Sequence, residues 1–201
     1  MAEITASMVK ELREITGAGM MDCKKALNET GGNMDEAVEY LRKNGQAKAE
    51  KKASRIAAEG ICRIASVGDQ IAAVVEVNSE TDFVAKNETF QQFVEAVAKQ
   101  AVSSEAADLD AFLAESWVED TSKTVQEALV DKIAVIGEKL SIRRFEKVEE
   151  KEGCVVTYVH GGGRIGVILD AKTDVVNDAV KEALTNLAMQ VAALYPKYVA
   201  T

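Results

Sequence analysis

Residues 60–102 read GICRIASVGDQIAAVVEVNSETDFVAKNETFQQFVEAVAKQAV, and the spacing of their apolar residues changes partway along. Residues 61–67 and 70–78 are rich in β-branched residues and are joined by Gly68-Asp69, a dipeptide suited to a tight turn. The residues that follow return to helical spacing, with apolar side chains at Phe90, Phe93, Val94, Val97 and Ala101. The segment therefore predicts a β-hairpin followed by a helix.

The same order occurs a second time further along the chain. A hairpin pattern covers residues 154–171, with three glycines at its centre, and a helical pattern covers 176–194. IAAVVE at 71–76 aligns with IGVILD at 165–170, and a Thr-Asp pair follows each of them, at 81–82 and 173–174. The repeat predicts two related hairpin-plus-helix subdomains that share a sheet, and the fold class is α+β.

A helix and a strand are expected between the two repeats. The apolar residues of the helix are Val125, Leu129, Ile133 and Ile136, and residues 140–148 have a strand-like composition. We expect the N-subdomain of the core to cover 60–138 and the C-subdomain to cover 139–201.

The first 45 residues predict a separate helical domain. Three apolar stripes at helical spacing are separated by Gly17-Ala18-Gly19 and by Gly31-Gly32. Asn33 followed by Glu36 resembles a capping box that opens the third helix. We expect three short helices in residues 1–45, with the last one ending near Asn44-Gly45.

Residues 46–59, QAKAEKKASRIAAE, combine strong helix formers with little apolar surface. This composition predicts an exposed connecting helix. Its lysines and arginine give it a basic face, which we interpret first as a solvated surface and only second as a docking surface.

Composition excludes several classes of protein. The 201-residue chain carries a formal charge of −9 and a pI near 4.8, so phosphate backbones would repel it and direct nucleic-acid binding is not expected. No apolar run reaches the roughly 20 residues that span a bilayer, and the N-terminus lacks the order of a signal peptide. We expect a cytoplasmic protein with a protein partner and no membrane contact.

Enzyme chemistry finds little support in the sequence. The three cysteines have no metal-binding spacing, and the single histidine, His160, stands beside three glycines at a predicted turn. HGGGRIG precedes a strand and lacks the Lys-Ser/Thr of a phosphate-binding loop, so a phosphate-handling enzyme rests on one weak motif. The acids Glu76, Glu80 and Asp82 are expected to be surface acids. No catalytic residue, metal site or cofactor is predicted.

Two features favour a protein contact without deciding it. Met20 and Met21 stand at a glycine-rich helix entry, where flexible apolar side chains serve either a partner or the core. Thr81-Asp82-Phe83-Val84 places an aromatic residue in the loop between strand and helix, whereas the second repeat has none there. A core anchor and a docking residue both remain open for Phe83.

Five motifs closely resemble the bacterial translation elongation factor Ts family. They are TGAGMMDCKKAL at 16–27, LRKNGQAKAEKKASRIAAEG at 41–60, VEVNSETDFVAKNETF at 75–90, IGEKLSIRRFE at 136–146 and HGGGRIGVILD at 160–170. They lie along nearly the whole chain, and the first and third together are highly specific.

The resemblance implies a guanine-nucleotide exchange factor for the GDP-bound GTPase EF-Tu, with no enzyme chemistry of its own. It implies a ubiquitin-associated-like three-helix N-terminal domain whose Met20 and Met21, together with Leu12, bind the GTPase. It also implies that the loop of Thr81, Asp82, Phe83 and Val84 binds the partner and displaces its magnesium.

Two departures from the family pattern affect these expectations. Gln190 stands where the family often has histidine, which removes or alters a contact. Many members continue beyond the position of Pro196, so the resemblance implies that the C-subdomain at 139–201 is incomplete and that exchange is weakened. The alternative function is a module or chaperone that binds EF-Tu without strong exchange activity. A homodimer and a 2:2 complex with the partner both remain open.

Overall fold

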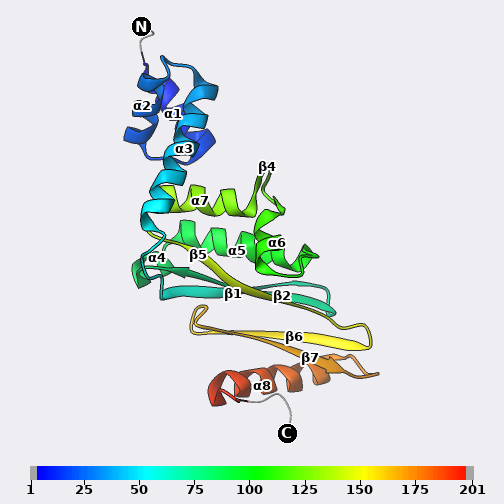
Figure 1. The fold of residues 1–201 in the computed structure, drawn as a ribbon. Helices are drawn as coiled ribbons and strands as arrows, with labels where there is room; N and C mark the ends of the chain where they lie inside the picture. The colour runs from blue at the N-terminus through cyan, green and yellow to red at the C-terminus, as the bar shows by residue number, and fades with distance from the viewer. Residues whose placement is uncertain (1–3, 198–201) are drawn as a thin grey trace. The chain divides into compact units, whose positions relative to one another are not determined.

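The computed structural model describes residues 4–197, which form two compact units (Figure 1). The first contains the described residues up to Ile56 together with Glu127–Lys139. The second contains Ala57–Gln126 and the described residues from Leu140 on. The end of the chain at Thr201, on which the expectation of an incomplete C-subdomain rested, lies outside the described residues.

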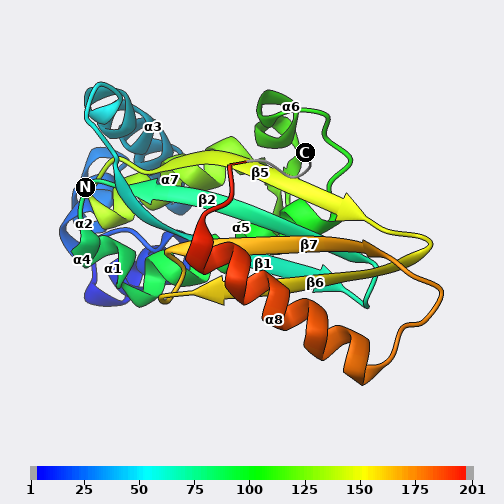
Figure 2. The ribbon, with the colours of Figure 1, turned by 90° about the horizontal axis from the view of Figure 1, so that it is seen from below.

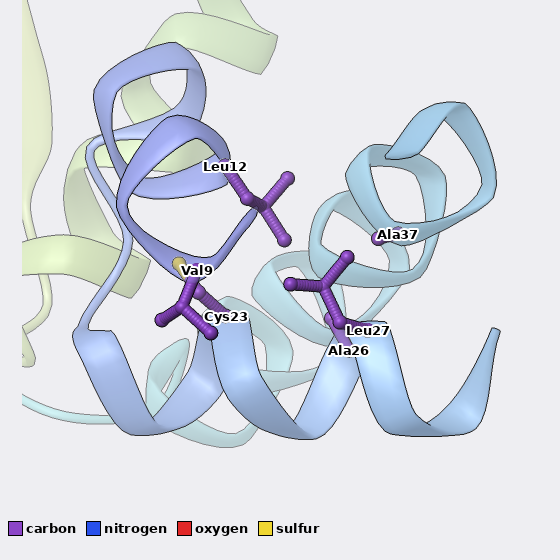
Figure 3. Packing of buried hydrophobic residues seen from close by; sticks show 6 residues of the cluster. All are labelled: Val9, Leu12, Cys23, Ala26, Leu27 and Ala37. Carbon is purple, nitrogen blue, oxygen red and sulfur yellow. The ribbon is translucent and has the colours of Figure 1, made fainter. Parts of the chain in front are cut away.

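Helices form the first unit. Its three N-terminal helices are α1 (Ala6–Thr16), α2 (Met20–Glu29) and α3 (Met34–Lys52), at the places the apolar spacing predicts. They enclose a core in which the side chains of Val9, Leu12, Cys23, Ala26, Leu27 and Ala37 lie close together (Figure 3). Burying a leucine side chain contributes roughly 1.5–3 kcal/mol, so Leu12 and Leu27 carry much of this core's stability.

Helix α3 is longer than the sequence predicts. Asn33 caps it, its Oδ1 accepting a hydrogen bond from the Glu36 N–H at 3.2 Å, but the helix does not end near Asn44-Gly45. Gly45 is buried, and a Cβ on it would lie 3.3 Å from the Cβ of Ala134 in α7 (Val125–Ile136). The glycine therefore permits close helix packing and is not a stop signal. The expected connecting helix over 46–59 is instead the last part of α3 followed by a non-helical segment.

The second unit is built on a three-stranded antiparallel sheet in the order β1-β2-β5. Strands β1 (Glu59–Val67) and β2 (Ile71–Ser79) form the predicted hairpin, and β5 (Ser141–Glu149) runs along the other edge of β2. Helix α5 (Glu88–Ser103) packs on this sheet and buries Phe90, Phe93, Val94 and Val97. The first hairpin-plus-helix repeat is thus confirmed as a packed unit.

Short elements follow α5 and extend its core. They are α6 (Leu109–Ala114), β3 (Ser116–Trp117) and β4 (Asp120–Thr124), and β3 pairs with β4. The Trp117 ring lies 5.7 Å from that of Phe93, and the Phe112 ring lies 4.6 Å from that of Phe145 on β5. The first contact joins β3 to α5, and the second joins α6 to the sheet.

The second repeat forms β6 (Gly153–His160), β7 (Ile165–Lys172) and α8 (Asp178–Leu194), as predicted. Its hairpin forms a layer on the β1–β2 hairpin, and α8 covers the far side of that layer (Figures 1 and 2). Val167, Ala188 and Ala192 form the small core between β7 and α8.

The prediction that the two hairpins share a sheet is wrong for residues 4–197, because β6 and β7 pair only with each other there. Glycines explain the stacked arrangement. The Gly163 carbonyl accepts hydrogen bonds from the N–H of Cys62 at 2.7 Å and from its thiol at 3.0 Å. A Cβ on Gly166 would come within 3.0 Å of Cys62 Sγ and of Val74 Cγ2. A side chain at Gly166 would therefore need its neighbours in the first hairpin to shift, and glycine avoids this.

The expected boundary between 60–138 and 139–201 also differs from the structure. Strand β5, placed in the C-subdomain by that boundary, is hydrogen-bonded along β2 of the first repeat. Most of α7, placed in the N-subdomain, belongs to the helical unit with α3. The physical reason is that each element follows the partner that buries its apolar residues, such as Ile142 of β5 and Ile133 of α7.

Among residues 4–197, no helix is long and apolar enough to cross a bilayer.

Candidate functional site

A short helical turn follows the end of β2. The predicted loop at residues 81–84 forms α4 (Asp82–Ala85), with Thr81 as its N-cap. Thr81 has extended backbone angles, and its Oγ1 accepts a hydrogen bond from the Val84 N–H at 3.4 Å. Threonine before aspartate favours a helix start, because the hydroxyl accepts from a free N–H and the carboxylate lies at the positive end of the helix.

Both ends of α4 are tied to the rest of the second unit. On the N-terminal side, the Ser79 hydroxyl donates to the Thr81 carbonyl at 3.0 Å. On the C-terminal side, the buried Ala85 accepts a hydrogen bond at its carbonyl from Gln91 Nε2 at 3.2 Å. Hydrogen bonds at both ends restrict the backbone of the turn, so a side chain on it projects from a fixed position.

Phe83 is the most exposed residue of this turn, with 81% of its surface accessible. Thr81, Asp82 and Val84 are each partly buried, so the aromatic ring projects beyond its neighbours. Burial of a phenylalanine side chain is worth roughly 1.5–3 kcal/mol, which the protein alone does not gain here. The reading of Phe83 as a core anchor is therefore wrong, and the docking role stays a prediction.

Asp82 lies beside positive charge. Lys86 Nζ is 2.7 Å from Asp82 Oδ2 in a salt bridge between positions i and i+4. The hydrogen bond and charge of Lys86 hold the pKa of the Asp82 carboxyl below its ordinary value, and the charge of Arg164 adds to this effect. Asp82 is therefore ionised at neutral pH, and the second repeat contributes Arg164 to its surroundings.

A groove in the second unit opens beside α4. It runs between the sheet and the tip of the β6–β7 hairpin, and its lining includes Glu76, Asp82, Lys86, Gln91, Arg144 and the glycines at 161–163. Arg144 Nε lies 2.7 Å from Glu76 Oε2, so two of the charges in the lining neutralise each other. Glu76 is thus an ion-paired acid whose side chain is 27% exposed.

The three glycines serve the geometry of a turn. All three have positive φ, at 60°, 70° and 108°, a region that favours glycine. The strand β7 follows them directly, so the helix N-terminus that a phosphate-binding loop needs is absent at this place. No group of three or more His, Cys, Asp or Glu side chains within residues 4–197 is arranged to hold a metal ion.

Met20 and Met21 lie at the start of α2 in the first unit, 59% and 76% exposed. Ile15 on α1 is exposed as well, at 57%. A core role for the methionine pair is therefore wrong, and the flexible apolar side chains are accessible for a contact.

Leu12 does not fit the role that the resemblance implies for it. Its side chain is fully buried in the core of the first unit (Figure 3). It lies on the inner face of α1, where the helical spacing of the apolar residues places it. Leu12 therefore stabilises the helices that carry Met20 and Met21 and is not itself available for a direct contact.

Three residues near α4 were not singled out from the sequence. Lys86 could have been found, because a lysine four residues after an aspartate is a recognisable helical ion pair. Gln91 and Arg164 carry no such local signal. Gln91 reaches back six positions to Ala85, and Arg164 comes from the other repeat.

Comparisons with known proteins agree with one another. The family model described as Elongation factor TS matches residues 80–201. The chain is 54% identical to Elongation factor Ts of Clostridioides difficile over 200 residues, which are 99% of the chain and 65% of that protein. It is 50% identical to Elongation factor Ts of Clostridium kluyveri over 196 residues, which are 97% of the chain and 64% of that protein. The chain thus spans just under two thirds of the length of these curated relatives.

Proposed function

This chain belongs to the elongation factor Ts family, and from that premise we propose that it is a guanine-nucleotide exchange factor for the GTPase EF-Tu in translation elongation. The observation that carries the proposal is the exposed ring of Phe83 on a turn held at both ends. The proposed setting is the cytoplasm, where translation takes place.

The proposed mechanism needs no covalent step and no enzyme chemistry. A GTPase holds GDP through backbone donors around the phosphates and through a magnesium ion that bridges phosphate and protein oxygens. Phe83 enters the partner as an apolar wedge, and burial of its ring, worth roughly 1.5–3 kcal/mol, offsets the separation of partner segments. Asp82, ionised and adjacent, disturbs the arrangement of ligands around the magnesium. GDP leaves faster because several of its contacts are broken in advance.

Thermodynamic linkage makes the cycle reversible. If this protein weakens GDP binding to EF-Tu by some factor, GDP weakens the binding of this protein by the same factor. Rebinding of nucleotide therefore releases the exchange factor.

The helical unit supplies a second contact in this proposal. Met20 and Met21 dock on the GTPase domain, since exposed methionines adapt to an apolar partner surface. The ubiquitin-associated-like character of residues 1–45 is part of the same proposal, and Leu12 supports the docking surface from within the core.

A second candidate function is a module that binds EF-Tu without strong exchange activity. It is favoured by the same exposed side chains, because Phe83, Met20 and Met21 could serve binding to EF-Tu whether or not GDP release is accelerated.

Release of fluorescent GDP from EF-Tu, with and without this protein, separates the two candidates. Faster release that is lost in Phe83→Ala and reduced in Asp82→Ala supports the exchange factor. Binding to EF-Tu in a titration with no faster release supports the second candidate. Both candidate functions would be refuted if this protein neither bound EF-Tu nor accelerated GDP release.

A further inference from the structure

Lys86 occupies a constrained place between two helices. Its N–H donates to the Asp82 carbonyl at 3.2 Å, at the C-terminal end of α4. The next residue, Asn87, caps α5, its Oδ1 accepting from the Phe90 N–H at 3.3 Å. Since both flanking elements fix the backbone here, the lysine side chain starts from a defined point.

From that point the lysine reaches the only ionised side chain of α4. The Nζ–Oδ2 distance between Lys86 and Asp82 is 2.7 Å, within the range of a charge-assisted hydrogen bond. Most exposed salt bridges add little to stability, because water screens them. The main consequence of this exposed contact is therefore the orientation of the Asp82 carboxylate, and its contribution to the stability of the fold is small.

The second repeat lacks both the turn and the lysine. Asn87 follows Thr81 by six residues, whereas the corresponding cap, Asn177, follows Thr173 by four. No helix is formed between Thr173 and Asn177. The position four residues after the second Asp-containing pair, counted from Asp174, is Asp178. The two extra residues of the first repeat thus bring α4 and Lys86 together.

We infer that Lys86 is a positioning residue for the proposed exchange function: it holds the Asp82 carboxylate in one orientation beside Phe83, ready for the partner. This inference rests on the proposed function. Without Lys86 the carboxylate would be free to turn toward Arg164, whose charge already influences it. The partner would then meet Phe83 without a correctly placed negative charge.

Lys86→Met tests the inference, because methionine keeps the unbranched chain and removes the charge. We expect the GDP release rate at saturating concentrations of this protein to fall roughly 3- to 10-fold, with less than about a 2-fold change in the concentration for half-maximal effect. Lys86→Arg, which can still bind the carboxylate, should restore the rate to within about 2-fold.

Lys151→Met is the matched control. Lys151 forms a salt bridge of 3.4 Å with Glu149, and these side chains are 81% and 47% exposed, against 72% and 46% for Lys86 and Asp82. Loss of a surface ion pair as such would affect both lysine variants alike. An equal fall in release rate for Lys86→Met and Lys151→Met would overturn the inference.

A double-mutant cycle shows whether Lys86 acts through Asp82. In an Asp82→Asn background, Lys86→Met should change the release rate no further, because the carboxylate that it positions is gone. If Lys86→Met lowered the GDP release rate by the same factor in the unchanged and in the Asp82→Asn background, a positioning role would be contradicted.

NMR titration of the Asp82 carboxyl group gives a readout that is independent of exchange. Its pKa should be higher in Lys86→Met than in the unchanged protein, and an unchanged pKa would overturn the inference whatever EF-Tu does. If the unchanged protein does not accelerate GDP release, the proposed function fails, and the positioning role fails with it. If the unchanged protein accelerates GDP release and Lys86→Met accelerates it equally, the positioning role alone fails.

Discussion

The two repeats of the second unit begin from the same local plan and end in different roles. In each, an antiparallel hairpin leads to a helix whose N-terminus is capped by asparagine. Asn87 Oδ1 accepts from the Phe90 N–H at 3.3 Å, and Asn177 Oδ1 accepts from the Val180 N–H at 3.0 Å. Similar local sequence signals therefore give the same local structure, a hairpin and a capped helix, in both repeats.

The environments of the two helices differ. Helix α5 buries the phenylalanines Phe90 and Phe93 among its core residues, whereas the buried residues of α8 are Ala188 and Ala192. Leu187 on α8, which aligns with Phe93, is 49% exposed. The same helical pattern thus gives a core helix in one repeat and a covering helix in the other, because tertiary neighbours decide how much apolar surface is removed from water.

The connection before the helix differs as well. The first repeat has α4 with its exposed Phe83, and the second passes from β7 to α8 without a helix. A two-residue difference in spacing between the Thr-Asp pair and the asparagine cap accounts for the extra turn. The first repeat thus holds the larger buried core and also carries the projecting residue.

The largest expected effect concerns the difference in burial. Phe90→Ala should lower the free energy of unfolding by about 3–5 kcal/mol, because it leaves a cavity in a packed core. Leu187→Ala should cost less than about 1 kcal/mol, because half of that side chain is already exposed. Urea unfolding measures both values. Similar losses for the two variants would break the comparison.

The next effect concerns the turn. With the Phe83→Ala variant, GDP should leave EF-Tu about 10- to 100-fold more slowly than with the unchanged protein. This is equivalent to roughly 1.4–2.7 kcal/mol of activation free energy. Its unfolding midpoint should not change, because the ring is 81% exposed. Val175→Ala, at the aligned position of the second repeat, is the control. With it, GDP should leave EF-Tu at the same rate as with the unchanged protein. An effect of Val175→Ala as large as that of Phe83→Ala would remove the functional asymmetry between the repeats.

A smaller effect tests what the repeats share. Asn87→Ala and Asn177→Ala should each lower the free energy of unfolding by about 1 kcal/mol, because each removes an acceptor from the first turn of a helix. Thermal and urea unfolding would measure this. A loss confined to one of the two variants would show that the caps are not equivalent.

The smallest effect is electrostatic. Because the folded-state pKa of Asp82 is lowered by Lys86, its salt bridge adds stability above the unfolded pKa of about 3.9, and this is lost as pH falls through the folded pKa. The stability difference between the unchanged protein and Asp82→Asn should therefore shrink from neutral pH to below that folded pKa. Unfolding at several pH values measures it. A difference that grows on acidification would give the wrong sign.

Much of the fold could be predicted from residues that are close in sequence. Both hairpins and the helix after each of them lie where the apolar spacing and turn glycines place them, and the three N-terminal helices are present as predicted, although α3 continues beyond its predicted end. These signals act over a few positions, as the contact between Asn33 and Glu36 does. The segment at 81–84 was predicted as a loop, with its role taken from the family resemblance, and it forms the short helix α4.

Tertiary structure decided what these signals leave open. Gly45 resembles a helix end in the sequence, but it lies inside α3 because α7 packs against it. Leu12 is placed in the core by the neighbouring helices, and the second hairpin stacks on Cys62 and does not extend the sheet. Arg164 reaches the surroundings of Asp82 only because the two repeats are packed together.

The sequence by itself therefore determined most of the helices and strands, the cap at Asn33, the duplication and the family resemblance. The folded chain alone decided which glycine permits packing, which apolar side chain is buried and which charges surround Asp82. The physical reason is range: helix and turn preferences depend on backbone hydrogen bonds within a few residues. Burial and electrostatics depend on atoms that are near in space, whatever their separation along the chain.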